Sequence, residues 1–238
     1  MSDSRHLLRT ALCAGPLLLS PAAHAMMDDD PVLYSLNAHE FEFGKESGEA
    51  TFNWDVTAWM GTTRDRLVAR TEGEDGEVAT EEFETLLLYS RALAPFWNVN
   101  AGWRGDWQPG ARRNWATVEL EGIAPGFIES RLSLLASSEG RLSARAEFQA
   151  EWFLTQNWQL IPRLETDWFS EPDVVNERED GLAALELGLR FAYVIRQDLR
   201  PYVGLQWNLQ LGDSRDLARA AGESPNSLQV VAGLAFWF

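Results

Sequence analysis

The sequence predicts an all-β protein, a transmembrane antiparallel up-and-down β-barrel of about 12 strands. Three observations lead to this prediction. Polar and apolar residues alternate with a period of two, short connections alternate with long ones, and no stretch after residue 25 is long and apolar enough for a membrane-spanning helix. A chain that crosses a membrane without such a helix has to close its sheet, because unpaired strand edges cannot face lipid.

The alternation is clear between residues 96 and 107. One side carries Trp97, Val99, Ala101, Trp103 and Trp107, and the other carries Asn98, Asn100, Arg104 and Asp106. The alternation is weakest in 64–72, and Pro162 removes one ladder hydrogen bond from 157–169. The complete pattern predicts strands at 37–45, 50–60, 64–72, 80–92, 96–107, 113–124, 127–137, 141–154, 157–169, 181–195, 199–211 and 227–238.

The connections between these strands fall into two classes. Connections that follow an even-numbered strand are short, namely 61–63, 93–95, 125–126, 155–156 and 197–198. Connections that follow an odd-numbered strand are mostly longer and charged, as at 73–79, 108–112, 170–180 and 212–226. One rim of tight turns and one rim of long loops is typical of outer-membrane barrels. In a soluble β-sandwich, no physical requirement would make short and long connections alternate.

Many of the 11 tryptophans stand where a strand meets a connection. Trp97 and Trp158 lie beside short turns, and Trp107, Trp115 and Trp168 lie beside long loops. Aromatic rings at a membrane–water interface have one wet edge and one apolar edge, so this placement indicates interfacial girdles. Tryptophan in a sandwich core would explain buried rings, but not their concentration at strand ends.

The start of the chain has the features of a cleaved signal peptide. A basic beginning is followed by an apolar stretch, and Ala23-His24-Ala25 supplies the small-x-small cleavage pattern. Cys13, the only cysteine, lies in this segment, so the expected mature chain has no disulfide. We therefore expect export in a Gram-negative bacterium, with a signal peptide at 1–25, a short acidic segment at 26–36 and an outer-membrane β-barrel at 37–238.

The charge balance is strongly acidic, with a formal net charge of −16. Such a charge argues against nucleic acid as a partner, because phosphates are bound by basic surfaces. It favours a cationic partner or a surface that stays hydrated. Lys45 is the only lysine, so nearly every positive charge is an arginine. Arginine pairs bidentately with carboxylates where water is scarce, although codon bias explains the same composition.

The face predicted to point into the barrel collects most of these charges. We expect a lumen charge network of Glu82, Glu84, Arg104, Asp106, Glu119, Glu121, Arg131, Arg145, Glu147, Arg163, Glu165, Glu186 and Arg190. The same face carries Glu40, Glu42, Asp55, Arg66, Arg70, Glu129, Glu151 and Asp167. Buried ions need counterions or water. The network therefore either fills and stiffens the barrel or lines a hydrated passage that favours cations, as acidic rings do.

Metal ligands are few after residue 25. Thioether sulfur suits Cu(I) and imidazole suits Cu(II), so Met26, Met27 and His39 are the candidate copper ligands. The alternative is that His39 is an ordinary residue at a strand start and that Met26 and Met27 belong to a terminal segment. The sequence contains no recognisable catalytic motif. A Ser–His dyad would have to use His39, and neither a P-loop nor a dinucleotide-binding fingerprint is present.

Several stretches resemble the copper resistance protein B family. Residues 81–97, EEFETLLLYSRALAPFW, resemble its E-x-E-x-Q-L-L-Y-S-R-A-I-A-P-F-W segment. Further stretches that resemble the family are 119–125, 138–141, 185–190, 200–204 and 231–238, so the resemblance runs from about Thr51 to the end. Members of the family carry a segment rich in Met and His before the barrel. Here that segment is reduced to Met26-Met27-Asp28-Asp29-Asp30, and no metal ligand is carried over residue by residue.

The resemblance implies a non-catalytic outer-membrane protein of copper homeostasis. Such a protein would bind a copper ion or aid its removal from the periplasm, together with periplasmic copper resistance proteins. One alternative is a passive, cation-preferring pore that is not specific to copper. Another is a plugged barrel whose loops at 170–180 and 212–226 contact an extracellular partner.

The last strand, 227–238, carries apolar residues at alternate positions up to the terminal Phe238. Such an ending resembles the signal that the barrel assembly machinery reads on new barrels. We expect this strand to pair with the first one near Phe41 and Phe43 and so to close the sheet. Its apolar face should then point to the lipid bilayer.

Overall fold

The chain folds into one closed sheet of antiparallel strands. In this computed structural model, the described residues are 30–46, 49–76, 82–108, 111–172, 180–212, 215 and 225–238. The strands are β1 (Leu33–Glu46), β2 (Glu49–Gly61), β3 (Asp65–Gly76), β4 (Glu82–Ala94), β5 (Trp97–Gln108), β6 (Ala111–Ala124), β7 (Ile128–Ser137), β8 (Leu142–Ala150), β9 (Trp152–Phe153), β10 (Trp158–Phe169), β11 (Gly181–Tyr193), β12 (Leu199–Gln210) and β13 (Asn226–Trp237). The described part contains no helix long and apolar enough to cross a membrane.

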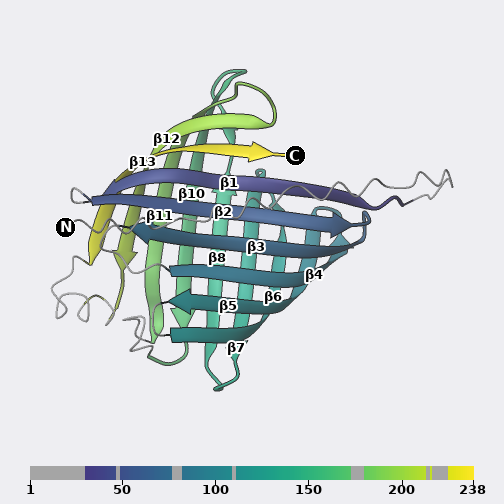
Figure 1. Cartoon of the computed structure of the whole chain (residues 1–238), viewed down its shortest axis with the longest axis vertical. Coiled ribbons are helices and arrows are strands. Elements are labelled where there is room, and N and C mark those ends of the chain that lie inside the picture. The colour runs from purple at the N-terminus through teal and green to yellow at the C-terminus, as the bar shows by residue number, and fades with distance from the viewer. Residues whose placement is uncertain are drawn as a thin grey trace, which may run out of the picture.

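Each strand pairs with the next one along the chain, except that β8 and β9 both pair with β10, and β13 pairs back onto β1. Phe43 stands opposite Ala232, and Phe41 stacks on Phe236 with ring centroids 5.6 Å apart. Figure 1 shows the near wall, formed by β1 to β5, crossing in front of the far wall. The prediction of a transmembrane antiparallel barrel of about 12 strands is confirmed, because β9 continues β8 and the closed sheet has 12 strands.

The break between β8 and β9 has a local cause. Both pieces keep one register on β10, with Gln149 opposite Arg163 and Phe153 opposite Gln159. Between these pairs β10 contains Pro162, which has no backbone N–H to donate to the ladder. The predicted strand 141–154 is therefore interrupted at Glu151, where its partner strand loses a donor.

Several strands are longer than the alternation predicted. The strand predicted at 64–72 continues to Gly76, because residues 72–76 pair with 51–55 of β2. The predicted loop at 73–79 is therefore partly strand. The predicted loop at 108–112 is shorter for the same reason, since Gln108 pairs with Ala111. At the other end of the chain, β1 begins at Leu33 rather than at residue 37 and pairs there with Gly61.

The outer face of the barrel is apolar. Large apolar side chains are exposed along it, among them Phe43, Leu67, Leu87, Val118, Leu132, Leu134, Leu189, Val203, Leu205, Leu228 and Val230. On β13, Leu228 and Val230 face outward while Gln229 and Val231 are buried, as the alternation predicts. In a soluble protein such a continuous apolar surface would promote aggregation, but facing lipid it costs nothing.

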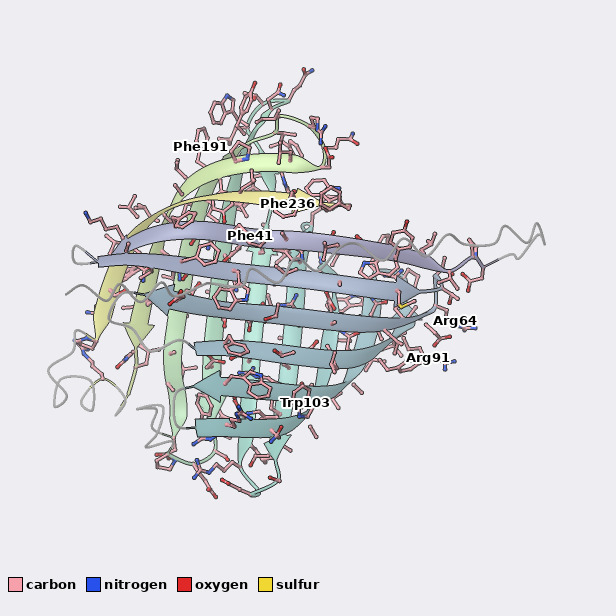
Figure 2. All side chains as sticks on the ribbon, in the orientation of Figure 1. Phe41, Arg64, Arg91, Trp103, Phe191 and Phe236 are labelled. Atoms are coloured by element: carbon pink, nitrogen blue, oxygen red, sulfur yellow. The ribbon has the colours of Figure 1, made fainter. Side chains whose placement is uncertain are left out.

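Aromatic side chains flank this band, with one exception to the prediction. Trp158 begins β10 and stacks on Phe191 with ring centroids 4.5 Å apart. Trp103 points away from the sheet on β5 (Figure 2). Trp115 does not belong to a girdle: it is buried inside the barrel, and its indole N–H donates to Asp106 over 2.7 Å. Its place near the end of a strand predicted an interfacial ring. Trp115 is, however, two residues from the inward-facing Thr117, and residues two apart on a strand point to the same face.

The closing seam depends on a close contact at Gly233. A Cβ atom at this position would lie 2.5 Å from the Tyr202 hydroxyl and 2.7 Å from the backbone oxygen of Phe41. Tyr202 is the direct cross-strand partner of Gly233, and its ring covers the space that a side chain would take. The glycine therefore allows β12, β13 and β1 to approach at the point where the barrel closes.

Gly233→Val should destabilise the barrel by about 1–3 kcal/mol, because the added side chain overpacks this seam. Urea unfolding in detergent micelles, followed by tryptophan fluorescence, measures the loss. Ala232→Val is the matched control: Ala232 is exposed on the outward face of the same strand, so this variant should unfold near the wild-type midpoint. Equal midpoints for both variants would contradict the importance of the seam contact.

Candidate functional site

The lumen contains two cavities at opposite ends. The larger, about 980 Å³, lies toward the rim of short turns and is lined by Thr63, Phe96 and Glu129 among others. The smaller, about 230 Å³, lies toward the rim of loops and is lined by Glu74, Trp107 and Asp167 among others. Three residues line both cavities: Glu40, Asp55 and Arg163.

Arg145 is the centre of the charge cluster at the loop end. It lies on β8 and reaches across the lumen to Glu72 on β3, with 2.6 Å between Nη1 and Oε1, and to Glu84 on β4, with 3.0 Å between Nη2 and Oε1. Its Nε lies 2.8 Å from Asp167 and 3.3 Å from Glu165, both on β10. One buried guanidinium thus compensates carboxylates on both walls of the barrel.

Arg104 extends this cluster along β4 and β5. It forms an ion pair with Glu84, and its Nε lies 2.7 Å from Asp106. Asp106 accepts a second hydrogen bond from Trp115. Because Glu72, Glu84 and Asp106 are successive cross-strand partners, their negative charges would repel each other without these two arginines.

A second cluster links β10 and β11 to β1. Arg163 lies 2.7 Å from Glu40 and 2.8 Å from Glu165. Arg190 lies 2.9 Å from Glu42 and 3.0 Å from Glu40. These contacts cross the part of the lumen where the two cavities meet, since Glu40 and Arg163 line both.

A third cluster lies on β3 to β8. Arg70 pairs with the buried Glu119 at 3.3 Å, and Arg131 pairs with Glu147 at 2.6 Å. Glu121 accepts a hydrogen bond of 2.8 Å from Asn100 and lies 3.9 Å from Arg131. Every arginine that the charge network was expected to contain therefore has a carboxylate partner in the structure.

The remaining expected residues are placed differently. Glu186 lines the smaller cavity but forms no ion pair with a residue that the structure describes. Glu82 begins β4, and its side chain lies outside the described part, as do Met26 and Met27. His39 occupies a β-bulge in β1, between Ala38 and Glu40, and its exposed side chain lines the larger cavity.

Two partners in these clusters were missed from the sequence. Glu72 is the last residue of a predicted strand. It is separated from Arg66 and Arg70 by an even number of positions, so it belongs to the same inward face. Arg200, which lies 2.6 Å from Glu151, precedes a proline near a strand start, where alternation is hard to follow. Both lie inside predicted strands, so following the alternation to the first and last residue of each strand would have identified them.

The described ranges contain no preformed metal site. There, no group of three or more His, Cys, Asp or Glu side chains is arranged to hold a metal ion. Met60 is exposed on the outward side of β2 and so does not reach the lumen. Of the candidate copper ligands, His39 alone falls among the described residues.

Asp30 is held at the mouth of the larger cavity. Its carboxylate accepts hydrogen bonds of 2.8 Å from both the backbone N–H and the hydroxyl of Thr63, which lines that cavity. The backbone hydrogen bond, with the hydroxyl, holds the pKa of Asp30 below its ordinary value. The carboxylate is therefore charged at neutral pH, and it places negative charge beside the entrance.

Comparison with known proteins identifies the family. The family model for the copper resistance protein B precursor matches residues 32–238. The chain belongs to the copper resistance protein B family. Copper resistance protein B of Escherichia coli is 33% identical over 210 residues, which cover 88% of this chain and 71% of the relative. A copper resistance protein B homolog of Pseudomonas syringae pv. tomato is 33% identical over 201 residues, covering 84% and 68%.

Solved structures show the same fold in this copper resistance protein B family member and in porins. The NanC porin superposes with a TM-score of 0.58 at 12% identity and covers 84% of this chain and 98% of the porin. The KdgM porin superposes with a TM-score of 0.53 at 8% identity, covering 86% and 99%. At this identity the likeness concerns the outer-membrane barrel architecture alone.

Arg145→Met should destabilise the barrel by about 3–5 kcal/mol, because it leaves several carboxylates without their counterion. Urea unfolding in micelles measures this loss. Arg196→Gln is the control: its ion pair with Asp198 is on the exposed β11–β12 turn, so it should cost less than about 1 kcal/mol. A midpoint for Arg145→Met equal to that of the control would show that the cluster does not stabilise the fold.

Proposed function

We propose that this protein serves copper tolerance from the outer membrane by holding or passing copper ions at the cavity beside its short-turn rim. Membership of the copper resistance protein B family carries the proposal. The cavity supports it, since in outer-membrane barrels the short turns face the periplasm. Export through the signal peptide 1–25, and insertion by the barrel assembly machinery through the strand that ends in Phe238, belong to the same proposal.

The chemistry of the cavity suits capture of a cation. His39 offers an imidazole nitrogen, a ligand type that suits Cu(II). The carboxylates of Glu129 and Glu151 line the same space, and Asp30 adds charge at its mouth. Met26 and Met27 precede Asp30 in the sequence and would supply the thioether sulfur that Cu(I) prefers. Periplasmic copper resistance proteins would exchange copper at this rim, and no step requires catalysis.

Copper titration of the purified mature protein tests the ligands. We expect saturable Cu(II) binding that weakens by about tenfold or more in His39→Gln, because one imidazole ligand is lost. Cu(I) binding should be lost when Met26 and Met27 are both changed to Ala. Met60→Ala is the control, since Met60 faces outward, and it should bind as the wild type does. Unchanged affinity in all three variants would refute the ligand assignment.

A second candidate is a passive pore that prefers cations and is not specific to copper. It is favoured by the excess of carboxylates along the lumen and by the lack of a three-ligand metal group among the described residues. Acidic linings attract cations of any kind.

Growth and conductance separate the two functions. If copper tolerance is the function, a deletion strain should grow poorly on copper, and the His39→Gln protein should fail to restore growth. If the protein is a passive pore, planar bilayers should show cation-selective currents that copper does not alter, and the deletion strain should grow normally on copper. Normal growth with no conductance would contradict both proposals.

A further inference from the structure

Asp55, at the middle of β2, is a buried carboxylate without a counterion. Its side chain is only 8% exposed, yet it forms no hydrogen bond or ion pair with any residue that the structure describes, and its Oδ1 has no partner. The other buried acidic and basic side chains in the described part all have ion-pair partners: Glu42, Arg70, Arg104, Glu119, Arg145, Asp167 and Arg190. Asp55 is therefore the exception among the buried charged side chains that the structure describes.

The neighbours of Asp55 make this exception costly. Its direct cross-strand partners are Glu40 on β1 and Glu72 on β3, so three carboxylates stand side by side on one inward row. Like charges directly opposite each other destabilise a sheet. Glu40 is compensated by Arg163 and Glu72 by Arg145, but neither arginine pairs with the carboxylate between them.

The positions before and after Asp55 on the inward face of β2 offer more oxygen atoms. Asn53 and Thr57 are each 8% exposed, and the Asn53 Oδ1 and Thr57 Oγ1 atoms have no hydrogen-bond partner among the described residues. Asn53 lines the smaller cavity, Thr57 lines the larger, and Asp55 lines both. A column of unpartnered oxygen atoms thus runs past the point where the two cavities meet.

Buried oxygen atoms of this kind need a partner from outside the chain. A hydrogen-bond donor or a cation satisfies them, and the central carboxylate favours a positive charge. Oxygen ligands select hard cations such as Ca²⁺ and Mg²⁺, whereas Cu(I) prefers sulfur. Since no three-ligand group is preformed in the described ranges, the ion would keep much of its water, as Mg²⁺ commonly does.

We propose that Asp55 binds a hard, partly hydrated divalent cation at the junction of the two lumen cavities, with Asn53 and Thr57 accepting hydrogen bonds from the water molecules that the ion keeps. The cation neutralises Asp55, the buried charged side chain of the described part that the arginines leave without an ion pair. This site differs from the proposed copper site in its ligands and in its position, and it does not depend on copper binding.

Direct binding of Ca²⁺ and Mg²⁺ tests the site. The probe is either ion alone, titrated calorimetrically into the full mature protein, purified in detergent without lipopolysaccharide and freed of metal with a chelator. We expect a saturable site in the wild type and binding weakened by about tenfold or more in Asp55→Asn, which keeps the shape but removes the charge. Glu139→Gln removes one charge from the exposed β7–β8 turn and should bind as the wild type does. Equal binding in all three proteins would overturn the proposal.

Unfolding provides a second readout that also reports misfolding. In chelator, Asp55→Asn should unfold at a higher urea concentration than the wild type, since it removes an uncompensated buried charge. Added Ca²⁺ should raise the wild-type midpoint and leave that of Asp55→Asn unchanged. If Ca²⁺ stabilises neither protein, a proton rather than a metal neutralises Asp55, and the proposal is overturned. The His39→Gln copper titration is independent, so either proposal can fail while the other stands.

Discussion

Charge compensation inside a closed sheet is the constraint on which the lumen depends. Side chains that point inward have only one another and enclosed water as partners, because the opposite face of every strand is apolar. Arg145, Arg163 and Arg190 meet this requirement by crossing the lumen to carboxylates on β1, β3 and β4. The same contacts hold opposite walls together, so they stiffen the barrel at the level where they divide its interior into two cavities.

This division shapes what the protein is able to do. The larger cavity lies beside the short turns, with His39 on its wall and Asp30 at its mouth, whereas the smaller one lies beneath the loops. An ion that moves from one cavity to the other has to pass Glu40, Asp55 and Arg163. Arg163 repels cations and is already paired with Glu40, so the free carboxylate of Asp55 is the group that would receive them. The proposed copper site at the rim and the proposed cation site at the junction thus occupy different parts of one lumen.

Family and fold contribute different information. Relatives at 33% identity place the chain in the copper resistance protein B family, while porins at 8–12% identity share only the barrel. A barrel wall leaves little room for functional difference, because its outer face must be apolar and its backbone must be fully paired. Differences in function between such barrels therefore have to come from residues other than those of the lipid-facing wall, such as the inward side chains.

The sequence by itself determined the barrel, the alternation of its faces and the closing strand. These follow from side-chain periodicity and turn length, which are local properties of the chain. Only the tertiary structure decided which arginine meets which carboxylate: Arg145 and Glu72 are 73 residues apart, and Arg190 and Glu42 are 148 apart. It also split β8 from β9 opposite Pro162 and left Asp55 without a counterion. Each of these depends on strand register and on distances across the lumen, and both exist only once the sheet has closed.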